Sequence, residues 1–290
     1  MGSEISSPEI SKLGVAMTMT SQSTALLAEA SRFAQRLGAT LTLIHTGTSE
    51  TESQAFLHDA ASRLAIHHEK HIVWNQTEPA PALARAAEKA EIEMLVVSAF
   101  EGPAVERRRF LGEVPRHLAE LAYCSLLFIA HPRIGAYDFR RIVVVTDFSD
   151  CSRTTCEHAL WLAQKDSAES LHIISIHTPF MQARADMGAV GVTPARTRAE
   201  EERLMRDFLA SLPEIEVPVD WRIVEATTGF AACDFVDSMD ADLLVLPGHN
   251  RASGRMPPMA DWALQVVPCS LWIVHGDAAW SMSSNENMSR

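Results

Sequence analysis

The sequence predicts an α/β protein made of two tandem doubly wound, mostly parallel five-stranded sheets with helices on both faces. Two observations lead to this prediction. Short apolar segments of strand character alternate with amphipathic helical segments, and the pattern of the first half recurs in the second. Such alternation implies a parallel sheet with right-handed crossovers. We place the first domain at residues 10–132, the second at 139–277 and a flexible tail at 278–290.

In the first half, apolar residues at helical spacing (Leu26, Ala30, Phe33) predict a helix that Ser21 or Ser23 caps and Gly38 ends. Proline falls in the first turn of a later helix, where its missing N–H costs nothing. The expected elements are, in order, a strand at 13–19, this helix, a strand at 41–44, a polar helix with Phe56, Ala60 and Leu64, a strand at 71–74, a helix at 81–90, a strand at 94–97, a helix at 112–121 and a strand at 125–130.

The second half repeats this order with one longer connection. Ser149 is the expected N-cap of its first helix. The expected elements are a strand at 141–146, that helix, a strand at 171–176, an extra segment at 179–194 rich in Gly and Pro, a helix at 195–212, a strand at 217–224, a helix at 230–238, a strand at 243–247, and a closing helix and strand.

Composition excludes several classes of function. The chain has 290 residues and a formal net charge of −12, which would repel nucleic acid and anionic membranes. No apolar run reaches the roughly 18 residues that a membrane span needs. The N-terminus lacks a secretory signal, and five cysteines without a CxxC motif indicate reduced thiols. We therefore expect a cytoplasmic protein with neither a nucleic-acid nor a membrane partner.

Several stretches resemble a known family. Thr146-Asp147-Phe148-Ser149 after a strand, Phe110-Leu111-Gly112-Glu113-Val114 before a closing helix, and Pro268-Cys269 before the last strand are similar to a universal stress protein domain. The chain is thus identified as a tandem universal stress protein. The resemblance implies that the last strands, 126–130 and 271–274, pair within the chain as a pseudo-dimer. It also implies self-association through these strands, as a homodimer.

The family's ATP-binding members carry an aspartate after the first strand and a glycine-rich loop after the fourth. In the second copy Asp147 matches the aspartate that contacts the nucleoside. The glycine positions fall on Pro247, Asn250 and Pro257-Pro258, and proline has no N–H for phosphate. Cofactor-binding candidates that remain here are Asp147, Gly248, His249, Asn250 and Gly254. An equally supported interpretation of Asp147 is that it stabilises the start of the following helix and contacts no ligand.

The first copy departs from the pattern in another way. Thr18 stands at the aspartate position, Gly112 at the last glycine and Glu113 at the Ser/Thr position. Glu101 and Glu113 bring negative charge to the phosphate loop, and Arg107-Arg108-Arg109 could offset it. Thr18, Gly112 and Glu113 are the candidate cofactor-binding residues of this half.

The resemblance therefore implies a non-catalytic stress-response or regulatory binding protein with degenerate nucleotide sites. No cofactor is assigned with certainty; ATP or AMP is the candidate, held weakly in the second copy. No catalytic set is found, and His67, His68 and His71 lack a metal-ligand spacing, so neither an enzyme nor a metal site is expected. The alternatives are an adenine-nucleotide-dependent enzyme, such as a slow ATPase, and a partner-binding module without a ligand.

Overall fold

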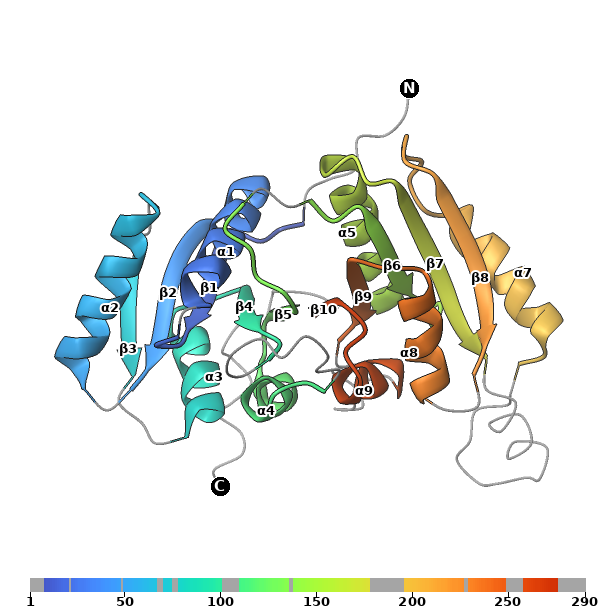
Figure 1. Cartoon of the computed structure of the whole chain (residues 1–290). Helices are drawn as coiled ribbons and strands as arrows, with labels where there is room; N and C mark the ends of the chain where they lie inside the picture. Colours follow the sequence, from blue (N-terminus) through green and yellow to red (C-terminus); the bar gives the residue numbers. More distant parts are fainter. Residues whose placement is uncertain are drawn as a thin grey trace, which may run out of the picture.

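The ten strands among the described residues belong to one continuous sheet (Figure 1), with the order β3-β2-β1-β4-β5-β10-β9-β6-β7-β8. The computed structural model describes residues 8–20, 22–47, 49–66, 70–74, 78–100, 110–135, 138–177, 196–226, 229–248 and 258–275. The expected segment at 179–194 and the tail at 278–290 lie outside these ranges. The α/β fold with mostly parallel strands and helices on both faces is confirmed.

The first half has the predicted order of elements. They are β1 (Lys12–Met17), α1 (Ser23–Leu37), β2 (Thr40–Thr46), α2 (Glu50–Arg63), β3 (Lys70–Trp74), α3 (Pro79–Lys89), β4 (Met94–Ser98), α4 (Glu113–Leu121) and β5 (Ser125–Ile129). Gly38 ends α1 with φ 69°, a left-handed conformation that glycine adopts without steric cost. The predicted serine cap of α1 is wrong: Gln22 is the N-cap, and Ser23 donates instead to the Thr18 carbonyl.

The second half follows the same order. It comprises β6 (Arg141–Val145), α5 (Asp150–Lys165), β7 (Ser170–His177), α7 (Arg198–Leu209), β8 (Val219–Glu225), α8 (Gly229–Ser238), β9 (Leu243–Pro247), α9 (Pro258–Gln265) and β10 (Ser270–Val274). Ser149 caps α5 as predicted, by accepting the Ser152 N–H. The start of α7 was predicted too early, because a capping box of Thr197 and Glu200 fixes it at Arg198.

An antiparallel pairing of β5 with β10 joins the halves, as predicted for the last strands. Trp272 lies opposite Leu127, flanked by the pairs Leu271–Phe128 and Ile273–Leu126. Two serine hydroxyls extend the pairing symmetrically: Ser270 Oγ accepts the N–H of Ala130 at 3.2 Å, and Ser125 Oγ accepts the N–H of His275 at 3.1 Å. Each acceptor serine begins one strand, and each donor follows the end of the other.

This pairing corrects the expectation of a homodimer through the last strands. β5 also pairs with β4, and β10 with β9, so each last strand already has a neighbour on both sides. Self-association through these strands is therefore intramolecular. A homodimer would need another surface and remains a prediction.

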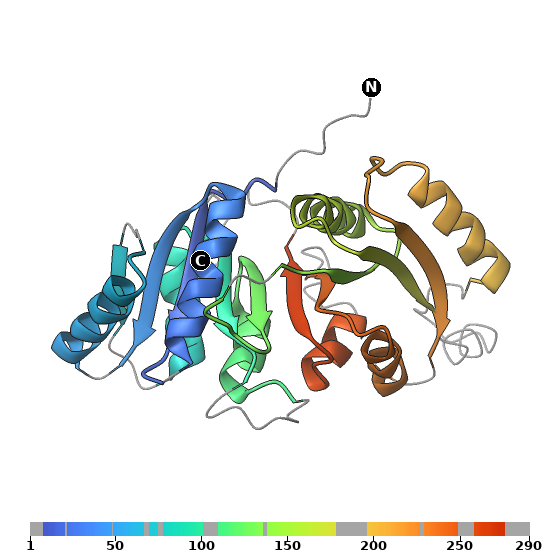
Figure 2. The ribbon, with the colours of Figure 1, turned by 45° about the horizontal axis from the view of Figure 1, so that its top comes forward.

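Helices cover both faces of the sheet (Figures 1 and 2). An apolar layer lies between the sheet and the helices on each face, and each layer runs through both halves. One contains residues of α1, α2, α5 and α7, and the other residues of α3, α4, α8 and α9. Because each layer is continuous across β5 and β10, the halves share their cores. No described helix is long and apolar enough to cross a membrane.

Trp272 is fully buried where the halves meet. Its ring makes an edge contact with Phe33 of α1, with centroids 5.7 Å apart, and stacks on His158 of α5 at the same distance. Burial lowers the pKa of His158 to about 4, so its ring is neutral at pH 7 and packs as an aromatic group. One side chain of β10 thus holds a helix from each half.

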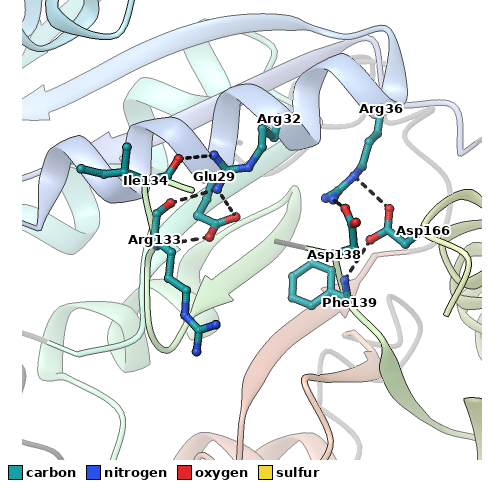
Figure 3. Close-up of polar contacts among 8 residues, drawn as sticks. All are labelled: Glu29, Arg32, Arg36, Arg133, Ile134, Asp138, Phe139 and Asp166. Carbon is teal, nitrogen blue, oxygen red and sulfur yellow. Dashed lines mark hydrogen bonds and ion pairs between the residues drawn. The ribbon is translucent and has the colours of Figure 1, made fainter. Parts of the chain in front are cut away.

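Charged side chains of α1 bind the segment that links the halves (Figure 3). Arg32 donates to the carbonyls of Ile134 and Arg133 at 2.8 and 2.9 Å, and Glu29 accepts the N–H of Arg133 at 3.2 Å. Arg32 and Glu29 also form an ion pair of 3.0 Å. These bonds satisfy backbone groups that follow β5 and fix the direction of the linker.

Arg36 reaches from α1 to the second half (Figure 3). Its Nε lies 2.9 Å from a carboxylate oxygen of Asp166, directly after α5, and a terminal nitrogen lies 2.6 Å from Asp138. The other Asp166 oxygen accepts the N–H of Phe139 at 3.0 Å. Burial raises the pKa of Asp166 to about 6, with Asp138 acting in the same direction, although Arg36, Lys165 and the Phe139 N–H oppose it.

Replacing Trp272 with alanine should lower the free energy of unfolding by about 3–5 kcal/mol, because the change leaves a cavity between β10, α1 and α5. Urea denaturation followed by circular dichroism measures this. The matched control is Trp221→Ala on β8, where the side chain is 37% exposed; its cost should stay below about 1 kcal/mol. Equal costs for the two variants would contradict a central role for Trp272.

Asp166→Asn should change how stability depends on pH. The folded pKa of Asp166 is about 6, above the unfolded value near 4, so its stabilising contribution is full below about pH 4 and is lost as the pH rises through 6. Asparagine does not titrate. The unfolding free energy of wild type relative to Asp166→Asn should therefore fall by roughly 1–3 kcal/mol between pH 4 and 7. Asp138→Asn, which removes the more exposed partner of Arg36, should show little of this change.

Candidate functional site

A pocket of about 350 Å³ opens in the first half, where β1, β2 and β4 end. The strand order reverses between β1 and β4, since the chain first proceeds outward to β3 and then returns to the other side of β1. Open α/β sheets bind ligands at the carboxyl ends of their strands at such a reversal. The fold therefore places this pocket, which we call the first-half pocket, where a ligand site is expected.

Apolar side chains form most of its wall. The lining residues are Ala16, Met17, Thr18, Met19, Thr20, Gln22, Ser23, Leu26, His45, Thr46, Pro79, Leu83, Val97, Ser98, Phe100, Val114 and Pro115. They come from three strand ends and from the first turns of α1, α3 and α4. Among these described residues none is Asp, Glu, Lys, Arg or Cys, and His45 is the one titratable side chain.

Thr18, the predicted counterpart of the nucleoside aspartate, does line this pocket. Its hydroxyl lies 3.1 Å from that of Thr20 and 3.3 Å from that of Ser23, while Ser23 donates to the Thr18 carbonyl. His45 Nδ1 lies 2.8 Å from the Met17 carbonyl, which can only accept, so this nitrogen carries the proton. The polar groups at this end of the pocket are thus largely bonded to one another.

Gly112 and Glu113 lie at the start of α4, beside the pocket residues Val114 and Pro115 but not in its wall. The Gly112 N–H donates to the Ala99 carbonyl at 3.0 Å, so it is not available to a phosphate. Gly112 has φ −59°, which any residue adopts. Glu113 is exposed and begins the helix, where a carboxylate interacts favourably with the helix dipole.

Asp147, the predicted site residue of the second half, acts at the start of α5. Its Oδ1 accepts the Ser149 N–H at 3.0 Å and the Ser152 hydroxyl at 2.5 Å. Partial desolvation of the carboxyl works toward a higher pKa, but the hydrogen bonds from Ser149 and Ser152 outweigh it and hold the pKa below its ordinary value. The structure therefore agrees with the interpretation of Asp147 as a residue that stabilises the start of α5.

Gly248 has a packing role between β9 and β10. Its N–H donates to the Val274 carbonyl at 2.7 Å. A Cβ at this position would lie 2.9 Å from that carbonyl oxygen and 3.0 Å from His275 Nδ1, so a side chain would clash. The remaining second-half candidates, His249, Asn250 and Gly254, lie outside the described residues, as do Glu101 and Arg107–Arg109 of the first half.

The described residues include histidines, cysteines and carboxylates, the side chains that usually bind metal ions. They contain no group of three or more His, Cys, Asp or Glu side chains placed to hold a metal ion; His67 and His68 lie outside the described ranges. Burial raises the pKa of the Cys124, Cys156, Cys233 and Cys269 thiols. These cysteines are unreactive core residues, as their apolar sequence surroundings predicted.

Sequence reasoning missed most of the first-half pocket. The sequence predicts no ligand contact for Met17, Leu26, Leu83, Phe100 or Val114, all of which line the pocket. A signal was present in the prolines of the first turns of α3 and α4, since each proline removes one N–H that a phosphate could use. The strand ends that bring these turns together are far apart in sequence, so their convergence was visible only in the fold.

Residues 138–275 match a family model described as the universal stress protein family. Three solved structures share the fold of nearly the whole chain. A functionally unknown protein from Pseudomonas aeruginosa PAO1 has a TM-score of 0.68 at 14% identity and covers 92% of this chain and 93% of its own. A putative universal stress protein from Pseudomonas aeruginosa UCBPP-PA14 has a TM-score of 0.67 at 14% identity, covering 92% of this chain and 94% of its own.

A universal stress protein from Archaeoglobus fulgidus DSM 4304 has a TM-score of 0.62 at 12% identity, covering 92% of this chain and 99% of its own. No match to this chain is found among the curated proteins. At these identities the solved structures establish the fold, and its extent over both halves, but no ligand.

Asp147→Ala should destabilise the protein by about 1 kcal/mol at pH 7, because the first turn of α5 loses an acceptor. The pKa of Asp147 is lowered in the fold, so its contribution is present above pH 4 and is lost as the pH falls below it. Thermal unfolding at pH 7 and at pH 3 measures the effect, which should shrink at the lower pH. Asp207→Ala, at an exposed site on α7, is the control and should leave stability unchanged.

Proposed function

Because residues 138–275 form a universal stress protein domain, we propose that this chain is a stress-response protein that binds a small molecule without chemically changing it. The first half, which repeats the strand order of that domain, serves as a second universal stress protein-like unit. Its pocket, not the equivalent edge of the second half, is the ligand site. This ranking of the halves is the reverse of the one that the sequence favoured.

The first-half pocket is the observation that carries this proposal. It has about 350 Å³ of space at the reversal of strand order, within the range of about 300–1,000 Å³ usual for small-molecule sites. At the corresponding place in the second half, Oδ1 of the Asp147 carboxylate accepts from Ser149 and Ser152, and the Gly248 N–H donates to the Val274 carbonyl. The Gly248 N–H would have to give up its internal bond before it could bind a phosphate.

The lining of the pocket favours binding over catalysis. General acid–base or nucleophilic catalysis needs a titratable or nucleophilic side chain next to the substrate. His45 is the one titratable side chain in the described lining, and its Nδ1 is held by the Met17 carbonyl. The hydroxyls of Thr18, Thr20 and Ser23 lie close together and have no carboxylate beside them in that lining.

Ligand-dependent stabilisation tests the proposal. A metabolite library is screened by thermal shift against wild type, Val114→Trp, which fills the first-half pocket, and Asp147→Ala, which changes the second half. A ligand at 100 times its dissociation constant stabilises by about 2.7 kcal/mol. We expect the shift in wild type and Asp147→Ala but not in Val114→Trp, with no hydrolysis of Mg²⁺-ATP by any of them.

Other outcomes would identify the alternatives. Mg²⁺-ATP hydrolysis activity that co-purifies with the protein would show that it is an adenine-nucleotide-dependent enzyme. A ligand effect lost in Asp147→Ala and kept in Val114→Trp would place the site in the second half. No effect from any small molecule would favour a module that binds only partner proteins.

A further inference from the structure

We infer that the first-half pocket takes an uncharged, mainly apolar small molecule and discriminates against phosphate-bearing nucleotides. This inference rests on the proposed function, since it names the class of ligand for the same site.

The wall of the pocket is apolar on several sides. The apolar lining residues belong to five different segments: Met17 to β1, Leu26 to α1, Leu83 to α3, Phe100 to the segment after β4, and Val114 to α4. These elements lie on both faces of the sheet, so the apolar surface surrounds the space and is not confined to one side. Burying a ligand's apolar surface here contributes about 25 cal/mol per Å².

A phosphate would find no charge to neutralise it in the described lining. That lining contains neither Lys nor Arg. An anion held next to apolar walls without a cation or several N–H donors loses much of its hydration energy. The lack of charged side chains in the described lining is therefore a selective feature, because it penalises charged ligands more strongly than neutral ones.

Two of the three helix starts around the pocket, those of α3 and α4, are also poor anion sites. α3 has Pro79 and Pro81 in its first turn, and α4 has Pro115, so three backbone positions lack an N–H. Glu113 adds a carboxylate to the first turn of α4. Phosphate sites at helix starts depend on free N–H groups and the positive end of the dipole. In α3 and α4 proline removes N–H donors, and the Glu113 carboxylate already interacts with the positive end of the α4 dipole.

Few polar groups remain for a ligand. Ser98 donates to the Phe100 carbonyl at 2.9 Å, and Thr18, Thr20 and Ser23 are linked to one another. Gln22, at the N-cap of α1, makes no capping hydrogen bond with its side chain, so its amide is the group best placed to bind a ligand. We therefore expect a ligand with an apolar body and at most one or two uncharged hydrogen-bonding groups.

A pair of fluorescent probes tests this directly. N-phenyl-1-naphthylamine is uncharged, and 8-anilino-1-naphthalenesulfonate has the same rings with an added sulfonate. The neutral probe should bind the full chain with a dissociation constant at least about tenfold lower than that of the sulfonate, because the pocket offers the anion no partner. AMP and ATP should not displace the bound neutral probe.

Two variants on α4 test whether the neutral probe binds in the first-half pocket. Val114→Trp should abolish binding of the neutral probe, whereas His117→Trp, at an exposed position of α4, should leave it unchanged. Thr20→Trp fills the pocket from an exposed loop position and replaces Val114→Trp if that variant does not fold. Circular dichroism confirms that each variant is folded.

The outcomes separate this inference from the proposed function. Tighter binding of the sulfonate or of AMP, lost in the pocket-filling variants, would keep the first-half site but overturn the neutral ligand class. Neutral-probe binding that neither Val114→Trp nor Thr20→Trp affects would overturn both.

Discussion

The antiparallel pairing of β5 with β10 is the contact on which the rest of this structure depends. It turns two five-stranded sheets into one and makes both apolar layers continuous between the halves. It also protects two strands that would otherwise have exposed edges, a common cause of aggregation in β-proteins. Trp272 lies at the centre of the pairing, where Phe33 and His158 contact it from helices of different halves.

Around this junction the two halves have kept one topology and diverged in chemistry. Ser23 lies five residues after Thr18, and Ser152 lies five residues after Asp147, the counterpart of Thr18 in the second half. Ser152 donates to the Asp147 carboxylate, whereas Ser23 donates to the backbone carbonyl of Thr18 and lies near the hydroxyls of Thr18 and Thr20. With threonine in place of aspartate, the first half has no carboxylate at this strand end, and an apolar pocket lies there. The exchange of aspartate for threonine at this one position thus coincides with a site that is apolar in the first half.

Most of the fold could be predicted, because strands and helices of this kind are encoded by local periodicity and by local turn residues. Gly38 and Ser149 ended and began helices as expected. Errors occurred at two helix starts where the N-cap residue was not recognised, Gln22 of α1 and Thr197 of α7. The candidate site was predicted less well. Alignment with a family pattern located Thr18, but gave Gly112 and Gly248 roles that their backbone hydrogen bonds do not allow.

The sequence by itself determined the α/β class, the order of the elements, the pairing of the last strands and the departure of both loops from a phosphate-binding pattern. These properties follow from periodicity, from repetition and from residue types such as proline, whose effect is local. Only the tertiary structure showed that the first half contains a pocket at the reversal of strand order, and which described residues line it. A cavity forms from side chains that are up to about a hundred positions apart, such as Met17 and Val114, and its existence depends on how completely they fill the space between them.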